Sequence, residues 1–155
     1  MKSDALDAPG RRLSKRIAER RLTARVRNKW AQVARDRLPS LKEVEALNFG
    51  ADRQFCFAID LRLSDIFPYF LFMGEALERY SAAYPLSDPR REKNLLDAAI
   101  AKMDEAAITR APVEYSDIKS LHNGLRIAFR SILLPVSENG SDVTHIFGAA
   151  SGKSL

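Results

Sequence analysis

The chain has 155 residues, 46% hydrophobic and 29% charged, which is typical of a globular domain with one core. No apolar run approaches the roughly 20 residues that a membrane-spanning helix needs, and no apolar signal segment follows Met1. The one cysteine, Cys56, cannot form an internal disulfide. Together these features predict a cytoplasmic protein with no membrane span.

The net charge of +5 is unevenly distributed along the chain. Residues 1–42 contain 13 Lys or Arg and 4 Asp or Glu, whereas residues 43–155 contain the other 12 and 16. A basic segment joined to a mildly acidic domain indicates an anionic partner such as nucleic acid. A solvated, arginine-rich helix face explains the same pattern, so both interpretations stay open.

The N-terminal part predicts a flexible leader over residues 1–12 and a basic helical segment over residues 13–48. Leu13–Leu38 contains no Gly or Pro and predicts one helix, which Pro39 ends. Ser40-Leu41-Lys42-Glu43 has the pattern of a capping box that begins a second, short helix. Four apolar residues recur at helical spacing on one face of the first helix: Leu22, Val26, Trp30 and Val33. This stripe either packs on the chain's own sheet or forms a dimer or partner interface.

The middle of the chain predicts two strands and two helices. Arg53–Leu61 alternates as a half-buried strand, and Tyr69–Met73 predicts a second strand that Gly74 ends. Glu75–Ala83 predicts a short helix. Asp88-Pro89 then predicts the start of a long helix that reaches about Arg110, since Asp is a good N-cap and Pro suits the first turn. The apolar face of that helix carries Leu95, Leu96, Ala99, Ile100 and Met103.

The last third of the chain predicts a three-stranded antiparallel meander. Its strands are Pro112–Leu121, Leu125–Val136 and Asp142–Ala150, followed by a tail over residues 151–155. Asn-Gly pairs separate the runs, and type I′ hairpin turns favour this pair because both central residues need a positive φ. The overall order predicts an α+β fold with one antiparallel sheet and helices on one face. Ile127, Phe129, Ser131 and Leu133 share one face, and Val143, His145 and Phe147 share a face of the next strand.

In this order of elements the chain resembles PAS domains, which have a five-stranded antiparallel sheet of order 2-1-5-4-3. It resembles more closely a group of stand-alone bacterial PAS-like proteins. In that group an N-terminal helix carries a Trp and ends in Leu-Pro, as in Trp30…Leu38-Pro39-Ser40. The last hairpin of the group matches Leu133–Gly148, here LLPVSENGSDVTHIFG, and Phe72–Leu77 matches its Gly-x-x-Leu element.

The resemblance covers roughly Trp30 to Ala150 and implies a PAS-like domain over residues 49–150. It also implies a sensory, signal-transducing domain with a cavity between sheet and helices, acting through contacts with a protein partner. We expect a homodimer, with Leu22, Val26, Trp30 and Val33 as contact candidates, and a small apolar ligand in the pocket. The candidates for the pocket are the residues predicted on the apolar face of the sheet: Phe55, Phe57, Ile59, Phe129, Leu133 and Phe147.

No catalytic or metal-binding constellation is evident in the sequence. Heme-binding PAS domains hold iron through a His on the long helix, and residues 89–110 contain none; His122 falls in a predicted turn and His145 on a strand. The Asn-Cys-Arg-Phe-Leu-Gln run of flavin-binding PAS domains is absent, so the identity of any cofactor stays open. A nucleic-acid-binding regulator that uses the arginine-rich helix is the main alternative. A small α+β enzyme is a further one, with Asp60 and Asp65 as the nearest acid–base candidates.

Overall fold

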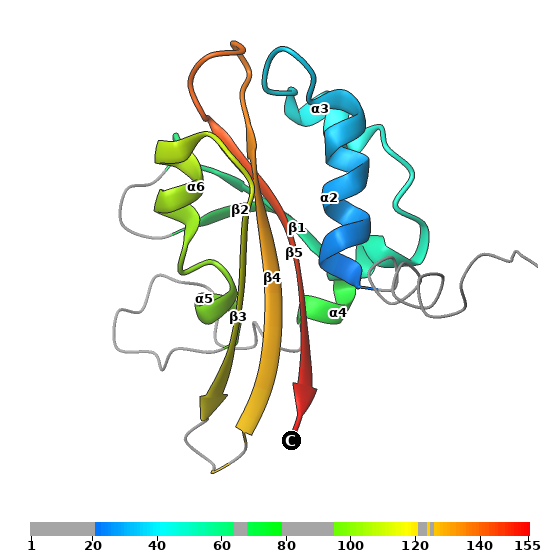
Figure 1. Cartoon of the computed structure of the whole chain (residues 1–155), viewed down its shortest axis with the longest axis vertical. Helices are drawn as coiled ribbons and strands as arrows, with labels where there is room; N and C mark the ends of the chain where they lie inside the picture. The colour runs from blue at the N-terminus through cyan, green and yellow to red at the C-terminus, as the bar shows by residue number, and fades with distance from the viewer. Residues whose placement is uncertain (1–20, 64–67, 79–94, 121–123, 125) are drawn as a thin grey trace, which may run out of the picture.

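Five antiparallel strands form one sheet in the order β2-β1-β5-β4-β3, which is the PAS-like order that the sequence predicts (Figure 1). The computed structural model describes residues 21–63, 68–78, 95–120, 124 and 126–155. The strands are β1 (Cys56–Asp60), β2 (Tyr69–Met73), β3 (Val113–Ser120), β4 (Arg126–Val136) and β5 (His145–Ser154). The last strand therefore lies between the first strand and β4, and the fold class is α+β and PAS-like.

Helices cover both faces of this sheet. On one face lie α2 (Leu22–Val33), α3 (Leu41–Glu45) and the 3-10 helix η1 (Gly50–Phe55); on the other lie α4 (Glu75–Glu78), α5 (Leu95–Ala99) and α6 (Met103–Thr109) (Figure 1). We call the buried layer beneath α2 the outer core and the layer beneath α4–α6 the inner core. The outer core contains Leu22, Val26, Trp30, Leu38, Val44, Phe49, Cys56, Ala58, Ile132, Leu134, Val136, Phe147 and Ala149. The inner core contains Phe57, Ile59, Leu77, Leu96, Ala99, Ile100, Ala106, Leu133, Ile146 and Ala150.

Strand β1 is shorter and more buried than its sequence predicts. All five of its residues are buried, because β1 lies between β2 and β5 and is covered on both faces. Its outer face carries the small residues Cys56 and Ala58, which alternate with larger apolar residues and so predicted a half-exposed strand. The preceding residues, predicted to begin this strand, form η1 instead.

Helix α2 ends at Val33, five residues before the predicted end. Ala34 already has an extended backbone, and Leu38 and Pro39 are buried. The Pro39 carbonyl accepts the backbone N–H of Ser137 at 2.9 Å, so this tertiary contact adds to proline in ending the helix. The predicted residues 13–20 of this helix and the leader lie outside the described part of the chain.

The capping box of the second helix is confirmed. Ser40 Oγ accepts the Glu43 N–H at 3.1 Å, and Glu43 Oε1 accepts the Ser40 N–H at 3.0 Å. These two reciprocal bonds satisfy backbone donors that the first turn of a helix otherwise leaves open.

The predicted long helix is wrong, because α5 and α6 are separate. The chain turns at Ile100–Lys102, where the Met103 N–H bonds to the Ile100 carbonyl at 3.0 Å, three residues back. Good helix formers fill this stretch, so its periodicity does not reveal the break. The predicted start of this helix at Asp88-Pro89 and the predicted end of the α4 helix at Ala83 lie outside the described residues.

Strand β5 extends through residues predicted as a tail. It pairs with β4 as far as Ser154 opposite Ile127, and the Leu155 N–H bonds to the Arg126 carbonyl at 2.9 Å. The prediction of a tail over residues 151–155 is therefore wrong. The sequence missed these pairs because Ser, Gly and Lys are poor indicators of a strand.

The β4–β5 connection is not a type I′ turn. Gly140 has φ of +84°, but Asn139 does not have a positive φ. The Asn139 Oδ1 atom instead accepts the backbone N–H groups of Ser141 and Asp142, each at 2.9 Å. Its side chain therefore replaces the backbone turn. In the β3–β4 connection, residues 121–123 lie outside the described part and Gly124 has φ of +85°.

Candidate functional site

Four of the six predicted pocket residues share the inner face of the sheet. Phe57, Ile59 and Leu133 are fully buried in the inner core. Phe129 lies in a neighbouring cluster, where its ring centroid is 5.5 Å from that of Tyr115 in an edge-on arrangement. This face has the apolar character that the sequence predicts, and a ligand on it stays a prediction.

Phe55 and Phe147 do not share that face, contrary to their predicted grouping. Phe147 pairs with Leu134 and is buried in the outer core, where its ring lies 5.2 Å from that of Phe49. Phe55 ends η1 and packs against the same core. The register of the last hairpin places Phe147 on the outer face, since a shift of one residue between strands moves a side chain to the opposite face. Phe55 departs from the predicted alternation because it belongs to η1 and not to β1.

The apolar stripe of α2 packs on the chain's own sheet. Leu22, Val26 and Trp30 are buried in the outer core, and Val33 packs at its edge. The indole Nε1–H of Trp30 donates to the Pro135 carbonyl on β4 at 3.1 Å. Within the described chain this stripe is therefore core, and its use as a dimer face stays untested.

The two stretches that carry the family resemblance contact each other. Besides the bond from Trp30 to Pro135 and the bond from Ser137 to Pro39, the Leu41 N–H donates to Glu138 Oε2 at 3.0 Å. Residues 30–41 and the β4–β5 hairpin thus form one hydrogen-bonded junction. This packing gives a structural reason for both sequence patterns in this chain.

A polar cluster with buried Asp60, Thr144 and His145 and an exposed Arg62 side chain lies at the end of β1 beside this junction. Asp60 accepts two side-chain hydrogen bonds from Arg62 at 3.1 Å each, and its Oδ2 lies 3.4 Å from His145 Nε2. His145 Nδ1 lies 2.8 Å from Thr144 Oγ1, which also accepts the Glu138 N–H at 3.1 Å. The bond from Arg62 holds the pKa of the Asp60 carboxyl below its usual range.

The sequence missed this cluster because its members come from three segments. Asp60 was an isolated candidate in the sequence, whereas the structure places His145 and Arg62 against it. The second acid candidate, Asp65, lies outside the described residues. The contacts of Asp60, Thr144 and His145 link β1 to β5 and the hairpin, and this structural role accounts for the burial of these three residues.

Cys56 lies on the outer face of β1, away from the inner core. Its side chain is buried, and its Sγ lies 3.4 Å from the Asp52 carbonyl oxygen. Burial raises the pKa of the Cys56 thiol to about 12. A redox-sensing or nucleophilic cysteine needs a lowered pKa, so this thiol is poorly suited to either role.

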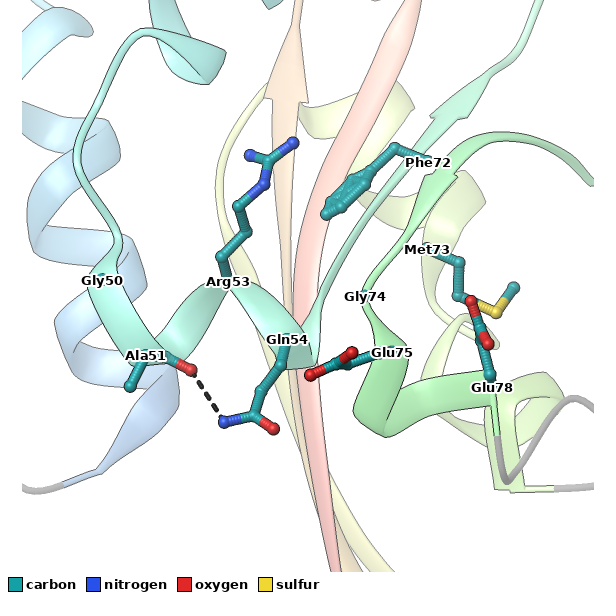
Figure 2. A pocket seen from close by; sticks show the side chains of 9 residues that line it. All are labelled: Gly50, Ala51, Arg53, Gln54, Phe72, Met73, Gly74, Glu75 and Glu78. Atoms are coloured by element: carbon teal, nitrogen blue, oxygen red, sulfur yellow. Dashed lines mark hydrogen bonds between the residues drawn. The ribbon is translucent and has the colours of Figure 1, made fainter.

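A pocket of about 440 Å³ lies at the rim of the sheet, between η1, the end of β2 and α4 (Figure 2). We call it the rim pocket. It is lined by Gly50, Ala51, Arg53, Gln54, Phe72, Met73, Gly74, Glu75 and Glu78. None of the six residues predicted to line a ligand pocket lines the rim pocket.

Gly74 is required where the chain passes from β2 to α4 at this pocket. Its N–H donates to the Cys56 carbonyl at 2.7 Å. A Cβ at this position would overlap the carbonyl group of Gln54. The Gly-x-x-Leu element of the resemblance therefore has a structural cause, with Leu77 buried in the inner core three residues later.

The basic segment uses part of its charge inside the chain. Arg25 pairs with Asp52 of η1 through two hydrogen bonds at 2.8 and 2.9 Å, and Arg37 pairs with Glu43 at 3.1 Å. Arg27 is exposed on α2. The nucleic-acid alternative therefore has fewer available cations than the composition suggests, and it stays a prediction.

Within the ranges given above, no group of three or more His, Cys, Asp or Glu side chains is placed to hold a metal ion. No described helix is long and apolar enough to cross a membrane.

Comparisons with known proteins give matches among solved structures alone. No family model and no curated protein matches the chain. The dark-state structure of the blue-light photoreceptor Aureochrome1 LOV is 17% identical over 75% of this chain and 86% of that chain, with a TM-score of 0.46. The light-state dimer of the fungal photoreceptor Vivid is 17% identical over 68% and 83%, with a TM-score of 0.43. At these values no property of either protein is transferred, and the PAS-like fold class rests on the strand order.

Proposed function

We propose that this chain is a regulatory PAS-like domain that acts through protein contacts, and that its first partner is a second copy of itself. The observation that carries the proposal is the exposed apolar edge at β2. Tyr69 is 49% exposed and Leu71 is 45% exposed on a strand that contains no charged residue. With α2 packed on its own sheet, this edge replaces the α2 stripe as the contact candidate.

The two edges of the sheet differ in a way that favours β2 as the interface. Strand β3 carries Glu114, Asp117 and Lys119, and charged side chains on an edge oppose pairing with another chain. Strand β2, by contrast, contains no charged residue. Exposed apolar side chains on an uncharged edge favour burial against a partner.

The oligomeric state tests this proposal directly. We expect the wild-type protein to self-associate in sedimentation velocity runs over a range of concentrations, and we expect Leu71→Lys to shift it to the monomer. Ile118→Lys on β3 is the matched control, because Ile118 is similarly exposed at 47% on the charged edge. A wild-type monomer at every concentration, or equal loss from both substitutions, would overturn the proposal.

A small apolar ligand that tunes these contacts is the second part of the proposal. Phe57, Ile59, Phe129 and Leu133 form the apolar inner face that supports it. The test is the absorbance spectrum of the protein purified without added cofactor, followed by denaturation and mass spectrometry of the released small molecules. A stoichiometric apolar compound is expected, and a protein with no bound compound that also shows none after incubation with cell extract would contradict this part.

A further inference from the structure

The rim pocket has a cationic wall made by Arg53. The guanidinium carbon of Arg53 lies 4.1 Å from the centroid of the Phe72 ring. A guanidinium stacked on an aromatic face keeps its N–H donors in its own plane, where they can meet a planar anion. Among the described residues no carboxylate forms an ion pair with Arg53. Its donors are therefore available to a carboxylate in the pocket.

The facing wall of the pocket is acidic. Glu75 begins α4 and Glu78 ends it, so the two carboxylates lie three residues apart on one side of the helix. Figure 2 shows them projecting from the α4 side, whereas Arg53 projects from η1. The carboxylates would repel a ligand that carries only a negative charge, and Arg53 would repel a ligand that carries only a positive charge.

Apolar side chains line the pocket together with the charged ones. At the end of β2, Phe72 lies beside Arg53 and Met73 lies beside Glu78, and Gly74 adds no side chain to fill the pocket. The volume of about 440 Å³ falls in the range of small-molecule sites, which combine apolar walls with a few convergent polar groups.

We propose that the rim pocket binds a small zwitterion in which an apolar spacer joins a carboxylate to an ammonium group. The carboxylate meets the guanidinium of Arg53, the ammonium meets Glu75, and the spacer lies over Phe72 at the end of β2. This site involves neither Tyr69 nor Leu71, so the inference stands apart from self-association at β2.

The test uses zwitterions of increasing length and their half-charged analogues. The wild-type protein is titrated at low ionic strength with the series from glycine to 6-aminohexanoate, and amide chemical shifts are followed by NMR. Hexanoate and hexylamine are the analogues that carry one charge each. We expect one chain length to bind saturably and about tenfold more tightly than either analogue, since each loses one charged hydrogen bond.

Two substitutions assign the charges to their walls. In Arg53→Gln the zwitterion should bind no more tightly than hexylamine. In Glu75→Gln the difference in affinity between the zwitterion and hexanoate should shrink. Arg27→Gln and Glu45→Gln change exposed residues outside the pocket and are the controls. Far-UV circular dichroism checks that every variant is folded. No saturable binding by any zwitterion, equal binding of the half-charged analogues, or unchanged preferences in both pocket variants would overturn the inference.

Discussion

At the scale of single residues, Gly148 shows how one atom can decide the packing of two strands. A Cβ on Gly148 would overlap the end of the Phe57 ring and lie 2.8 Å from the Ile132 carbonyl oxygen. We expect Gly148→Ala to lower the free energy of unfolding by about 1–3 kcal/mol, the usual cost of overpacking a core. Urea denaturation measures this loss, and Ser154→Ala at the exposed end of the same strand should change little. A variant as stable as the wild type would contradict the close contact.

Asp60 is the residue from which we expect a pH dependence of stability. Its folded pKa lies below the unfolded value of about 4, so its ionised form stabilises the fold above that pH. This contribution should be lost as the pH falls through the folded pKa. Asp60→Asn should therefore reduce the free energy of unfolding at pH 7 and flatten its decline in acid.

Urea denaturation between about pH 3 and pH 7 measures this difference, since the carboxylates that stabilise a fold titrate in that window. Asp36→Asn at an exposed position is the control. If the stability of Asp60→Asn falls in acid as steeply as that of the wild type, the hydrogen bonds from Arg62 do not stabilise the folded state.

At the scale of elements, the short helix α3 depends on the capping box at its start. Ser40→Ala removes the acceptor of the Glu43 N–H and should cost about 1 kcal/mol. Ser40→Asp keeps an acceptor at the N-cap and should retain most of the stability. Thermal unfolding compares the two variants with the wild type, and a Ser40→Ala variant as stable as the wild type would show that the cap contributes nothing.

Local chemistry explains which elements the sequence predicts well. The capping box and the strand Tyr69–Met73 depend on neighbouring residues, and both are confirmed. The early end of α2 is accompanied by a contact with the distant Ser137, which periodicity does not contain, and the break between α5 and α6 is a local turn at Ile100–Lys102 that the helix-forming residues there do not signal. The grouping of Phe147 with the inner face is wrong because Phe147 pairs with Leu134 of the outer core, a register that alternation along one strand does not give.

The candidate sites also differ in how far the sequence alone could predict them. The apolar inner face follows from alternation along single strands, so its main members could be predicted. The rim pocket and the cluster around Asp60 could not, because each joins segments whose spacing along the chain has no pattern. Arg53 and Glu75 are ordinary charged residues in the sequence, and only the pairing of β1 with β2 brings their segments together.

At the scale of the whole molecule, α2 belongs to the core and not to a separate arm. Val26 is fully buried between α2 and the sheet, and Trp30 is the only tryptophan of the chain. Trp30 fluorescence therefore reports the docking of α2, whereas far-UV circular dichroism reports the secondary structure of the whole chain. We expect both signals to change in one coincident urea transition, as for a two-state domain.

Val26→Ala tests this coupling, because it leaves a cavity beneath α2 and keeps the tryptophan as the fluorescent probe. Removing two buried methyl groups should cost about 1–3 kcal/mol, and both transitions should move together to lower urea. Ala31→Gly on the exposed side of α2 weakens the helix by about 1 kcal/mol without opening a cavity, and it should also shift both signals together. If the fluorescence transition precedes the circular dichroism transition in either variant, α2 undocks before the sheet unfolds. The buried stripe would then become available to a partner, as the sequence alone allows.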